Sequence, residues 1–268
     1  MGKVSRQVGK GLGDGWEGSW EGSWESRLLF IFMRGTDSAA RERVEKPKEN
    51  ENMSNMKTGP IKVAVLGGTG NMGKHFVRQA LDAGHNLRLL VRNASKVEPR
   101  EHPRVEVVVG DATKSEDVAK VVAGVDVVVS CLGNVGKFRI MEKSFNNILA
   151  AAATQQKVPR CLLVTSIGCG GTSWPVKWML ILIGGKASFD DYDRADKRVR
   201  EESSVPCVLV RPFALTDKPG NGKYHAKEEQ NGTFMRPIPR ADVAKFLVDA
   251  VTDTRWDGKP GIQLVGNK

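Results

Sequence analysis

The sequence has no apolar run long enough to cross a membrane. Its longest candidates are LLFIFM at 28–33 and WMLILIG at 178–184, whereas a membrane-spanning helix needs roughly 18 apolar residues. It also has no block of like charges: the net charge is +10, but the 41 lysines and arginines are interleaved with 31 acids. We therefore expect no membrane and no nucleic-acid partner, and a basic surface suited to an anionic cofactor and a small-molecule substrate.

Cysteine is scarce in this chain. The four cysteines are Cys131, Cys161, Cys169 and Cys207, and no two of them form a Cys-x-x-Cys pair. Three of them lie in or beside apolar runs, which is typical of buried, reduced thiols in a reducing compartment. The pattern excludes a disulfide framework, gives no metal site, and leads us to expect a cytoplasmic protein.

Residues 1–58 lack the apolar periodicity that would bury a core. They contain the repeat GWEGSWEGSWES and a charged run, RERVEKPKENEN, at 41–52. We expect a disordered low-complexity tail over 1–58 and one folded domain over 59–268. The spacing of the tryptophans also fits one face of a partner-binding helix, although the glycines oppose it. An alternative is that Met53 or Met56 is the natural start.

From residue 61 onward, strand-like runs alternate with helix-like stretches. Most of the strand-like runs are continuously apolar, as expected for strands covered on both faces. The alternation predicts an α/β fold with a doubly wound parallel sheet, which binds ligands at the carboxyl ends of its strands. The expected strands are 61–66, 86–91, 105–110, 125–130, 161–166, 206–211 and 261–265. The expected helices are 71–83, 115–123, 140–157, 189–204 and 240–252.

Glycines at a spacing of three follow the first expected strand. The stretch VLGGTGNMG at 65–73 places Gly67, Gly70 and Gly73 between this strand and a helix. The first glycine allows a tight turn, the second lets the backbone approach a diphosphate, and the third lets the helix pack on the strand. The first N–H groups of the helix would bind the phosphates. The expected cofactor contacts in this loop are Gly67, Thr69, Gly70, Asn71, Met72 and Gly73.

The end of the second expected strand lacks an acid. NAD sites usually place a carboxylate there to bind the ribose 2′-hydroxyl group. The stretch LLVRNASK at 89–96 instead offers Arg92, Ser95 and Lys96, whose charges and hydrogen bonds suit a 2′-phosphate. We therefore expect NADP rather than NAD.

The ends of the third, fourth and fifth expected strands carry candidate contacts, and Leu132 and Gly133 follow the fourth strand. After the third strand, the carboxylate of Asp111 can accept a hydrogen bond from the adenine amino group. After the fifth strand, Ser166 is placed to orient the nicotinamide or to bind a substrate carbonyl, although a serine at a strand end is as often a helix cap. The expected cofactor contacts at these ends are Asp111, Ala112, Leu132, Gly133, Thr165 and Ser166.

The ordered set of motifs resembles a known family. VLGGTGNMG, LLVRNASKV, LLVTSIG, RPFALTD and PRADVAKFLVDAV are similar to motifs of the atypical short-chain dehydrogenase/reductases, the NAD(P)H-binding, NmrA-like family, and within it to the biliverdin-IXβ reductase/flavin reductase group. The resemblance implies a single Rossmann-like domain and an NADP-dependent reductase. It also implies that Ser166 lies at the nicotinamide and that Pro212 and Phe213 touch the cofactor.

One departure from the wider superfamily concerns its Tyr-x-x-x-Lys pair. Tyr192 is followed at that spacing by Asp196, and Lys197 is one residue too far along. One residue turns a helix by about 100°, so Lys197 would point away from the face that Tyr192 uses. Ser166, Tyr192 and Lys197 remain the candidate catalytic residues, with Tyr192 otherwise a pocket or surface residue.

The apolar stretch between Ser166 and Tyr192 bears on the substrate. We expect it either to cover a flat pocket for a planar acceptor or to pack against the core or a second subunit. The expected function is NADPH-dependent hydride transfer to an acceptor of the flavin, biliverdin or quinone type. The alternatives are a non-catalytic NADP-binding sensor, or a carbonyl reductase or epimerase of a biosynthetic pathway that uses Tyr192 or Lys197 as the acid. We expect a monomer or a weak homodimer.

Overall fold

The computed structural model describes residues 59–99, 101–134, 138–170, 174–228, 236–259 and 261–267. The tail expected over 1–58 lies outside these residues. In the described part of the chain, no helix is both long enough and apolar enough to span a bilayer.

Eight strands form the central sheet, in the order β3-β2-β1-β4-β5-β6-β10-β8. Every neighbouring pair is parallel except β10 with β8. This order confirms the doubly wound, Rossmann-like α/β fold. The strands are β1 (Lys62–Leu66), β2 (Asn86–Val91), β3 (Val105–Val109), β4 (Val127–Ser130), β5 (Arg160–Val164), β6 (Cys207–Pro212), β8 (Tyr224–Glu228) and β10 (Ile262–Gly266).

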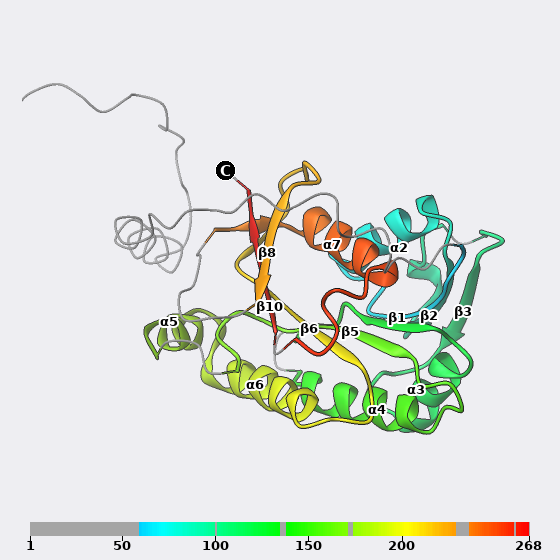
Figure 1. Ribbon diagram of the computed structural model, residues 1–268, viewed down its shortest axis with the longest axis horizontal. Helices are drawn as coiled ribbons and strands as arrows, with labels where there is room; N and C mark the ends of the chain where they lie inside the picture. The colour runs from blue at the N-terminus through cyan, green and yellow to red at the C-terminus, as the bar shows by residue number, and fades with distance from the viewer. Residues whose placement is uncertain are drawn as a thin grey trace, which may run out of the picture. The chain divides into compact units, whose positions relative to one another are not determined.

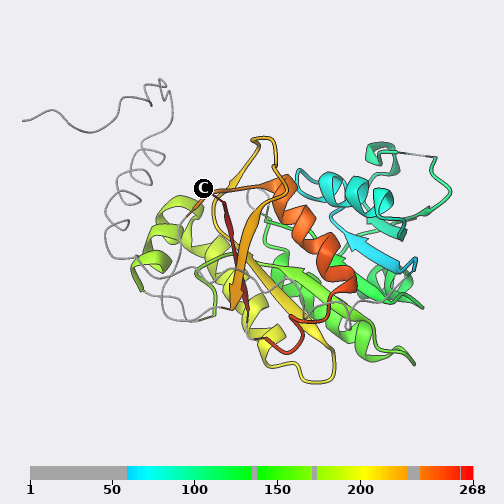
Figure 2. The same cartoon turned by 45° about the horizontal axis from the view of Figure 1, so that its top comes forward.

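Helices cover both faces of the sheet. Figures 1 and 2 show α2 and α7 on one face and α3, α4 and α6 on the other, which explains why the inner strands are apolar on both sides. The helices are α2 (Gly73–Asp82), the 3₁₀ turn η2 (Ala94–Lys96), α3 (Ser115–Val122), α4 (Met141–Ala153), α5 (Trp174–Gly184), α6 (Lys186–Arg200) and α7 (Arg240–Thr252).

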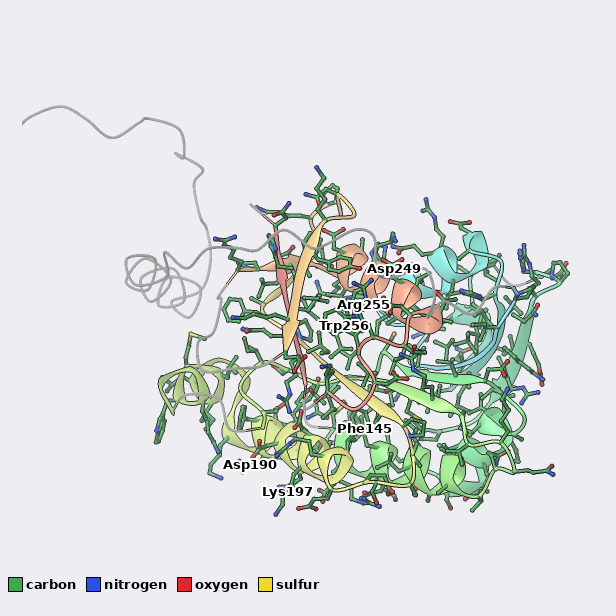
Figure 3. All side chains as sticks on the ribbon, viewed as in Figure 1. Phe145, Asp190, Lys197, Asp249, Arg255 and Trp256 are labelled. Atoms are coloured by element: carbon green, nitrogen blue, oxygen red, sulfur yellow. The ribbon has the colours of Figure 1, made fainter. Side chains whose placement is uncertain are left out.

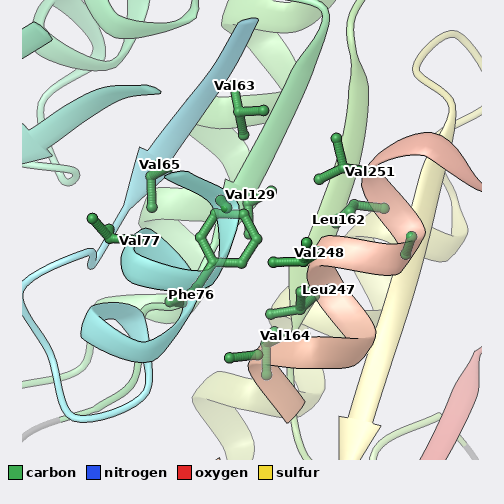
Figure 4. Close-up of a cluster of buried hydrophobic side chains, with 14 of the residues drawn as sticks. Val63, Val65, Phe76, Val77, Val129, Leu162, Val164, Leu247, Val248 and Val251 are labelled. Carbon is green, nitrogen blue, oxygen red and sulfur yellow. The ribbon is translucent and has the colours of Figure 1, made fainter. Parts of the chain in front are cut away.

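The core under α2 and α7 is made of interlocking side chains from both helices and the sheet. Phe76 of α2 is fully buried and lies between the valines of β1 and β4 and the α7 residues Leu247 and Val248 (Figure 4). A second core, around Phe145 of α4, fills the other face. The two cores hold the carboxyl ends of the strands in one line, so the loops that leave those ends form a common edge.

A buried ion pair connects the second half of the sheet to α6. Arg211 of β6 donates to Asp196 of α6 through Nε at 2.8 Å and Nη2 at 2.6 Å. Thr165 Oγ1, just after β5, and Arg200 Nε also donate to this carboxylate, at 3.1 and 3.0 Å. The side chains of Asp196 and Arg211 are 0% and 2% exposed, so the charge of each compensates that of the other in the absence of solvent.

Three elements differ from the sequence-based expectation. The apolar run at 174–184 is helix α5, and the edge strand β8 (YHAKE) pairs antiparallel with β10. A small two-stranded sheet joins β7 (Leu215–Thr216) to β9 (Ile238–Pro239). Neither YHAKE nor these two-residue strands has the apolar pattern of a buried strand, so only their pairing partners define them.

Replacing Asp196 by asparagine tests the weight of this ion pair. The variant leaves the guanidinium of Arg211 buried against a neutral group, so we expect the free energy of unfolding to fall by about 3–5 kcal/mol, measured by urea denaturation. The matched control is Asp190→Asn, which breaks the exposed pair with Lys186 on the same helix and should cost at most about 0.5 kcal/mol. Equal losses in the two variants would contradict a special role for Asp196.

Candidate functional site

The turn between β1 and α2 has room only for glycine at two positions. Gly67 has a φ of +80°, and a Cβ there would lie 2.9 Å from the carbonyl carbon and oxygen of Cys131. A Cβ on Gly73 would overlap the carbonyl oxygen of Gly67. The turn is closed by a hydrogen bond from Gly70 N to Gly67 O at 3.0 Å. Its backbone is therefore open to close approach by a ligand.

The start of α2 provides backbone donors for an anion. The helix begins at Gly73, its N-cap Met72 makes no side-chain capping bond, and its first turn has no acid. Thr69, Gly70 and Asn71, which lead into it, are exposed. Lys74 N and His75 N already donate to Gly70 O and Met72 O at 3.0 and 3.1 Å, so the donors for a phosphate would be backbone N–H groups that precede Lys74. The positive end of the helix dipole favours an anion at this position.

The ends of β2 and β3 place a cation beside a carboxylate. Arg92 and Lys96 are exposed, and Ser95 N donates to Asn93 Oδ1 at 2.8 Å in the η2 turn. Asp111 Oδ1 accepts from Thr113 N at 2.8 Å. Thr113 Oγ1 donates to the same oxygen at 2.9 Å. The two hydrogen bonds from Thr113, and to a smaller extent the charge of Arg92, lower the pKa of Asp111. The carboxylate is therefore ionised at neutral pH and oriented at this edge of the sheet.

The loop after β4 meets Tyr192 of α6. Asn134 N donates to Tyr192 Oη at 3.2 Å, and a Cβ on Gly133 would lie 3.1 Å from this oxygen. Asn134 also anchors the loop, because its Oδ1 accepts from Ile140 N at 3.1 Å. Burial raises the pKa of Tyr192, although the Asn134 N–H group opposes this shift. Tyr192 is thus a neutral phenol at neutral pH, held against the backbone of this loop.

The loop after β5 carries Thr165 and Ser166. Thr165 is buried and its hydroxyl group donates to Asp196, so its side chain supports the fold. Ser166, the next residue, is half-buried at the carboxyl end of the strand. Leu180 of α5 packs against Gly168, where a Cβ would overlap it. The loop is therefore held at Thr165 by the Asp196–Arg211 pair and at Gly168 by α5.

A family model described as NAD(P)H-binding matches residues 67–254, from the glycine turn to the residue pair after α7. The chain belongs to the NAD(P)H-binding family. This confirms the resemblance found in the sequence at the level of the family, and the uncapped glycine turn fits the phosphates that a nicotinamide dinucleotide carries.

Curated relatives share parts of this sequence. An uncharacterized chloroplastic protein of Arabidopsis thaliana is 28% identical over 204 residues, which cover 71% of this chain and 71% of that protein. Other relatives match over shorter stretches, and the chain spans between 19% and 36% of the length of several of them.

Solved structures share the fold of this NAD(P)H-binding chain. An anaerobillin reductase from Escherichia coli O157:H7 has a TM-score of 0.64 and 21% identity, covering 77% of this chain and 98% of that one. A short-chain dehydrogenase/reductase from Veillonella parvula, solved in complex with NADP, has a TM-score of 0.65 and 19% identity, covering 76% and 94%. At this level of identity the likeness is one of fold.

The two contacts expected at the end of β6, Pro212 and Phe213, have buried side chains. The Phe213 side chain is 1% exposed, so its ring belongs to the core, and its N–H group donates to Leu264 O at 3.1 Å. Pro212 is buried, and its carbonyl accepts from Ile167 N at 3.2 Å. At the end of β3, the Ala112 carbonyl accepts from Asn147 Nδ2 at 3.0 Å, and after β4 Leu132 is half-buried against the core.

Lys197 does not join the other candidate catalytic residues. Its side chain is 67% exposed and its Nζ lies 3.7 Å from Glu201 Oε1. Figure 3 shows it on the outer side of α6, away from the sheet. The helix rotation expected from the sequence is the physical reason, because Asp196 occupies the inward position that follows Tyr192 by one turn. A catalytic role for Lys197 is therefore withdrawn.

Helix α5 divides the apolar run into two faces. Met179 is buried and Leu180 contacts Gly168, whereas Trp178 and Leu182 are 57% and 65% exposed. One face thus packs on the loop after Ser166, as the alternative of core packing expected. The planar-acceptor pocket stays a prediction.

Two acids that hold loops at this edge, Asp191 and Asp242, were not predicted from the sequence. Asp191 accepts from Met141 N at 3.0 Å and so caps α4 from another helix. Asp242 accepts from Gly222 N at 2.9 Å and fixes the turn before β8. Each lies in a helix where an acid also serves as an ordinary surface residue, so no local signal marked it.

Gly73→Ala tests the glycine turn. The added Cβ must displace the Gly67 carbonyl group, so we expect the Kd for NADPH to rise by at least about tenfold, since distortion of the turn by one ångström or so removes well-aligned phosphate contacts. The measurement is fluorescence titration, with Tm recorded for each variant. Gly184→Ala, where no other atom lies within 4 Å of the new Cβ, is the control. An unchanged Kd in Gly73→Ala would argue against this turn as the phosphate site.

Proposed function

We propose that this protein is an NADPH-dependent oxidoreductase that transfers a hydride to a planar acceptor of the flavin, biliverdin or quinone type. The observation that carries the proposal is the shared edge of the sheet. On it lie the uncapped glycine turn, the exposed cations after β2 and the half-buried Ser166 after β5. Along the sheet the order is the cations after β2, the glycine turn after β1 and Ser166 after β5. This is the order in which a dinucleotide would run from adenosine through the diphosphate to nicotinamide.

NADP is the cofactor that the charges favour. The end of β2 has Arg92, Ser95 and Lys96 where NAD sites usually have an acid. A guanidinium and an ammonium group there would stabilise the 2′-phosphate, while Asp111 would accept from adenine. The proposed contacts in the middle of the cofactor are the backbone of Leu132 and Gly133 and, at the nicotinamide end, Ser166 with the backbone of Pro212.

The chain's own groups would position the reacting atoms. The cofactor supplies the hydride when it is bound. Ser166 would donate a hydrogen bond to the ring or to an acceptor oxygen, and α5 would shield one side of Ser166 from water. A flavin or biliverdin type of acceptor can take its proton from solvent, so this reaction does not need a protein acid. The fold shared with an anaerobillin reductase agrees with an extended acceptor.

A second candidate is reduction of a carbonyl group, and one contact favours it. The Asn134 N–H group donates to the Tyr192 oxygen, so the phenol hydrogen is directed elsewhere and a developing phenolate is stabilised. In this arrangement a backbone N–H group takes the part that a lysine plays in a Tyr-x-x-x-Lys pair, and Tyr192 donates the proton to the carbonyl oxygen.

NADPH oxidation by the purified protein with FMN as acceptor tests the first proposal. We expect turnover with NADPH and weaker turnover with NADH. Ser166→Ala should lower kcat by about 10- to 100-fold, because it removes the donor at the nicotinamide. Arg92→Gln should raise the KM for NADPH by about tenfold and leave that for NADH unchanged, because one charge-assisted bond to the 2′-phosphate is lost.

Two matched variants control this experiment. Ser203→Ala lies in the exposed loop after α6, and Arg255→Gln removes an arginine that pairs with Asp253 beyond α7. Both should retain wild-type rates. Tight NADPH binding with no turnover on FMN, biliverdin or quinones would contradict the reductase proposal and favour an NADP-binding sensor.

Tyr192→Phe separates the two reactions. If Tyr192 is a proton donor, the variant loses activity on carbonyl acceptors by about 100-fold or more and keeps its activity on FMN. Burial raises the pKa of Tyr192, so this acid stays protonated through neutral pH and its contribution falls only at strongly alkaline pH. Wild-type rates of Tyr192→Phe on every acceptor would leave Tyr192 as a wall of the site.

A further inference from the structure

The loop that follows β6 pairs with the residues before α7 in a small sheet. β7 pairs with β9, and Thr216 lies opposite Pro239 in this pairing. The residues that follow them, Asp217 and Arg240, form an ion pair in which Arg240 Nη1 donates to Asp217 Oδ1 at 2.7 Å. Residues far apart in the sequence thus meet at the start of α7.

The start of α7 lies beside the first turns of α2. The two helices are neighbours on one face of the sheet (Figures 1 and 2), and Gln79 Nε2 of α2 donates to Ala241 O of α7 at 3.0 Å. His75 lies one turn before Gln79, toward the glycine turn. Its pKa is lowered by burial and by neighbouring cations that include Arg240, whereas Asp217 raises it. The Arg240–Asp217 pair is therefore near the end of α2 that begins at the glycine turn.

Positive charge prevails at this end of α2. Lys74 and Arg78 are exposed, and within the described ranges neither forms an ion pair. The carboxylate that faces Arg240 belongs to Asp217, whose side chain is 77% exposed, whereas that of Arg240 is 22% exposed. Water screens an ion pair with so exposed a carboxylate, so the pair is weak.

Arginine is suited to exchange such a partner for a phosphate. Its guanidinium has five N–H donors in a planar fork, and Asp217 engages it through Nη1 alone. A phosphate offers two oxygens at the spacing of the fork, and hydrogen bonds between two charged groups are among the strongest in proteins. A phosphate held at the start of α2 would therefore compete with Asp217 for Arg240.

We propose that Arg240 binds the diphosphate of the dinucleotide, and that Asp217 is a built-in competitor that holds the same guanidinium when no cofactor is bound. The inference rests on the proposed function, because it needs a dinucleotide on the glycine turn. It assigns the diphosphate rather than the 2′-phosphate, since Arg240 neighbours the start of α2 while Arg92 and Lys96 follow β2. No covalent step is involved.

The test compares the Kd values of NADPH and NADH for the full chain, measured by fluorescence titration at fixed ionic strength. Both cofactors have the diphosphate, but only NADPH has the 2′-phosphate. We expect Arg240→Gln to raise both Kd values by the same factor, about tenfold. Asp217→Asn should lower both by about two- to threefold, because the competitor is removed.

Two further variants keep the result decisive. Arg255→Gln removes the arginine beyond the other end of α7, labelled in Figure 3, and should change neither Kd. In the double variant Arg240→Gln/Asp217→Asn, the Asp217 change should have no effect, because its only proposed action is through Arg240. A tightening by Asp217→Asn that persists in the double variant would overturn the competitor role.

The remaining outcomes separate this inference from the proposed function. A loss of NADPH affinity alone in Arg240→Gln would assign the residue to the 2′-phosphate and overturn the diphosphate assignment. Unchanged Kd values for Arg240→Gln, with a wild-type protein that binds NADPH, would overturn this inference and leave the proposed function intact. A wild-type protein that binds neither cofactor would overturn both.

Discussion

The buried pair between Asp196 and Arg211 is the interaction on which the carboxyl ends of β5 and β6 depend. It joins α6 to β6, and through Thr165 it also fixes the first residue after β5. The pair leaves no space around it: a Cβ on Gly170 or on Gly261 would overlap the guanidinium of Arg211. Two separate loops therefore close over one arginine, and Ser166 starts from a position that the ion pair determines. A buried charge pair is a costly way to hold such a junction, but it fixes direction as well as distance.

The edge above this pair divides into two halves with different chemistry. On the side of β2 and β3, exposed cations and the ionised Asp111 suit the adenosine part of a dinucleotide. On the side of β4 and β5, the candidate residues Ser166 and Tyr192 are themselves uncharged at neutral pH. The glycine turn lies between the halves, at β1. Under the proposed function, cofactor binding and hydride transfer would occupy different parts of this edge, and the exposed cations after β2 would lie at the adenosine part.

Tyr192 illustrates how tertiary contacts replace a missing motif. One turn after Tyr192, the inward position holds Asp196, whose carboxylate is paired with Arg211. An acid at this position cannot provide the positive charge that a lysine would place beside the phenol. The Asn134 N–H group instead reaches the phenol oxygen from the loop after β4. A backbone donor stabilises negative charge on that oxygen without adding a titrating group. The loop is in turn held by the Asn134 side chain and by the capping of α4 from Asp191.

The sequence by itself determined the parallel sheet, its strand-helix alternation and the glycine turn. These features are local: a buried strand reads as an apolar run, and three glycines between a strand and a helix leave few other structures open. It also indicated that Lys197 would point away from the face that Tyr192 uses, because helix rotation follows from spacing alone. Only the tertiary structure placed Asp196 against Arg211, Asn134 on Tyr192, Arg240 with Asp217 and β8 beside β10. Each of these joins residues from separate elements, and a single acid, amide or short polar strand has no local pattern that names its partner.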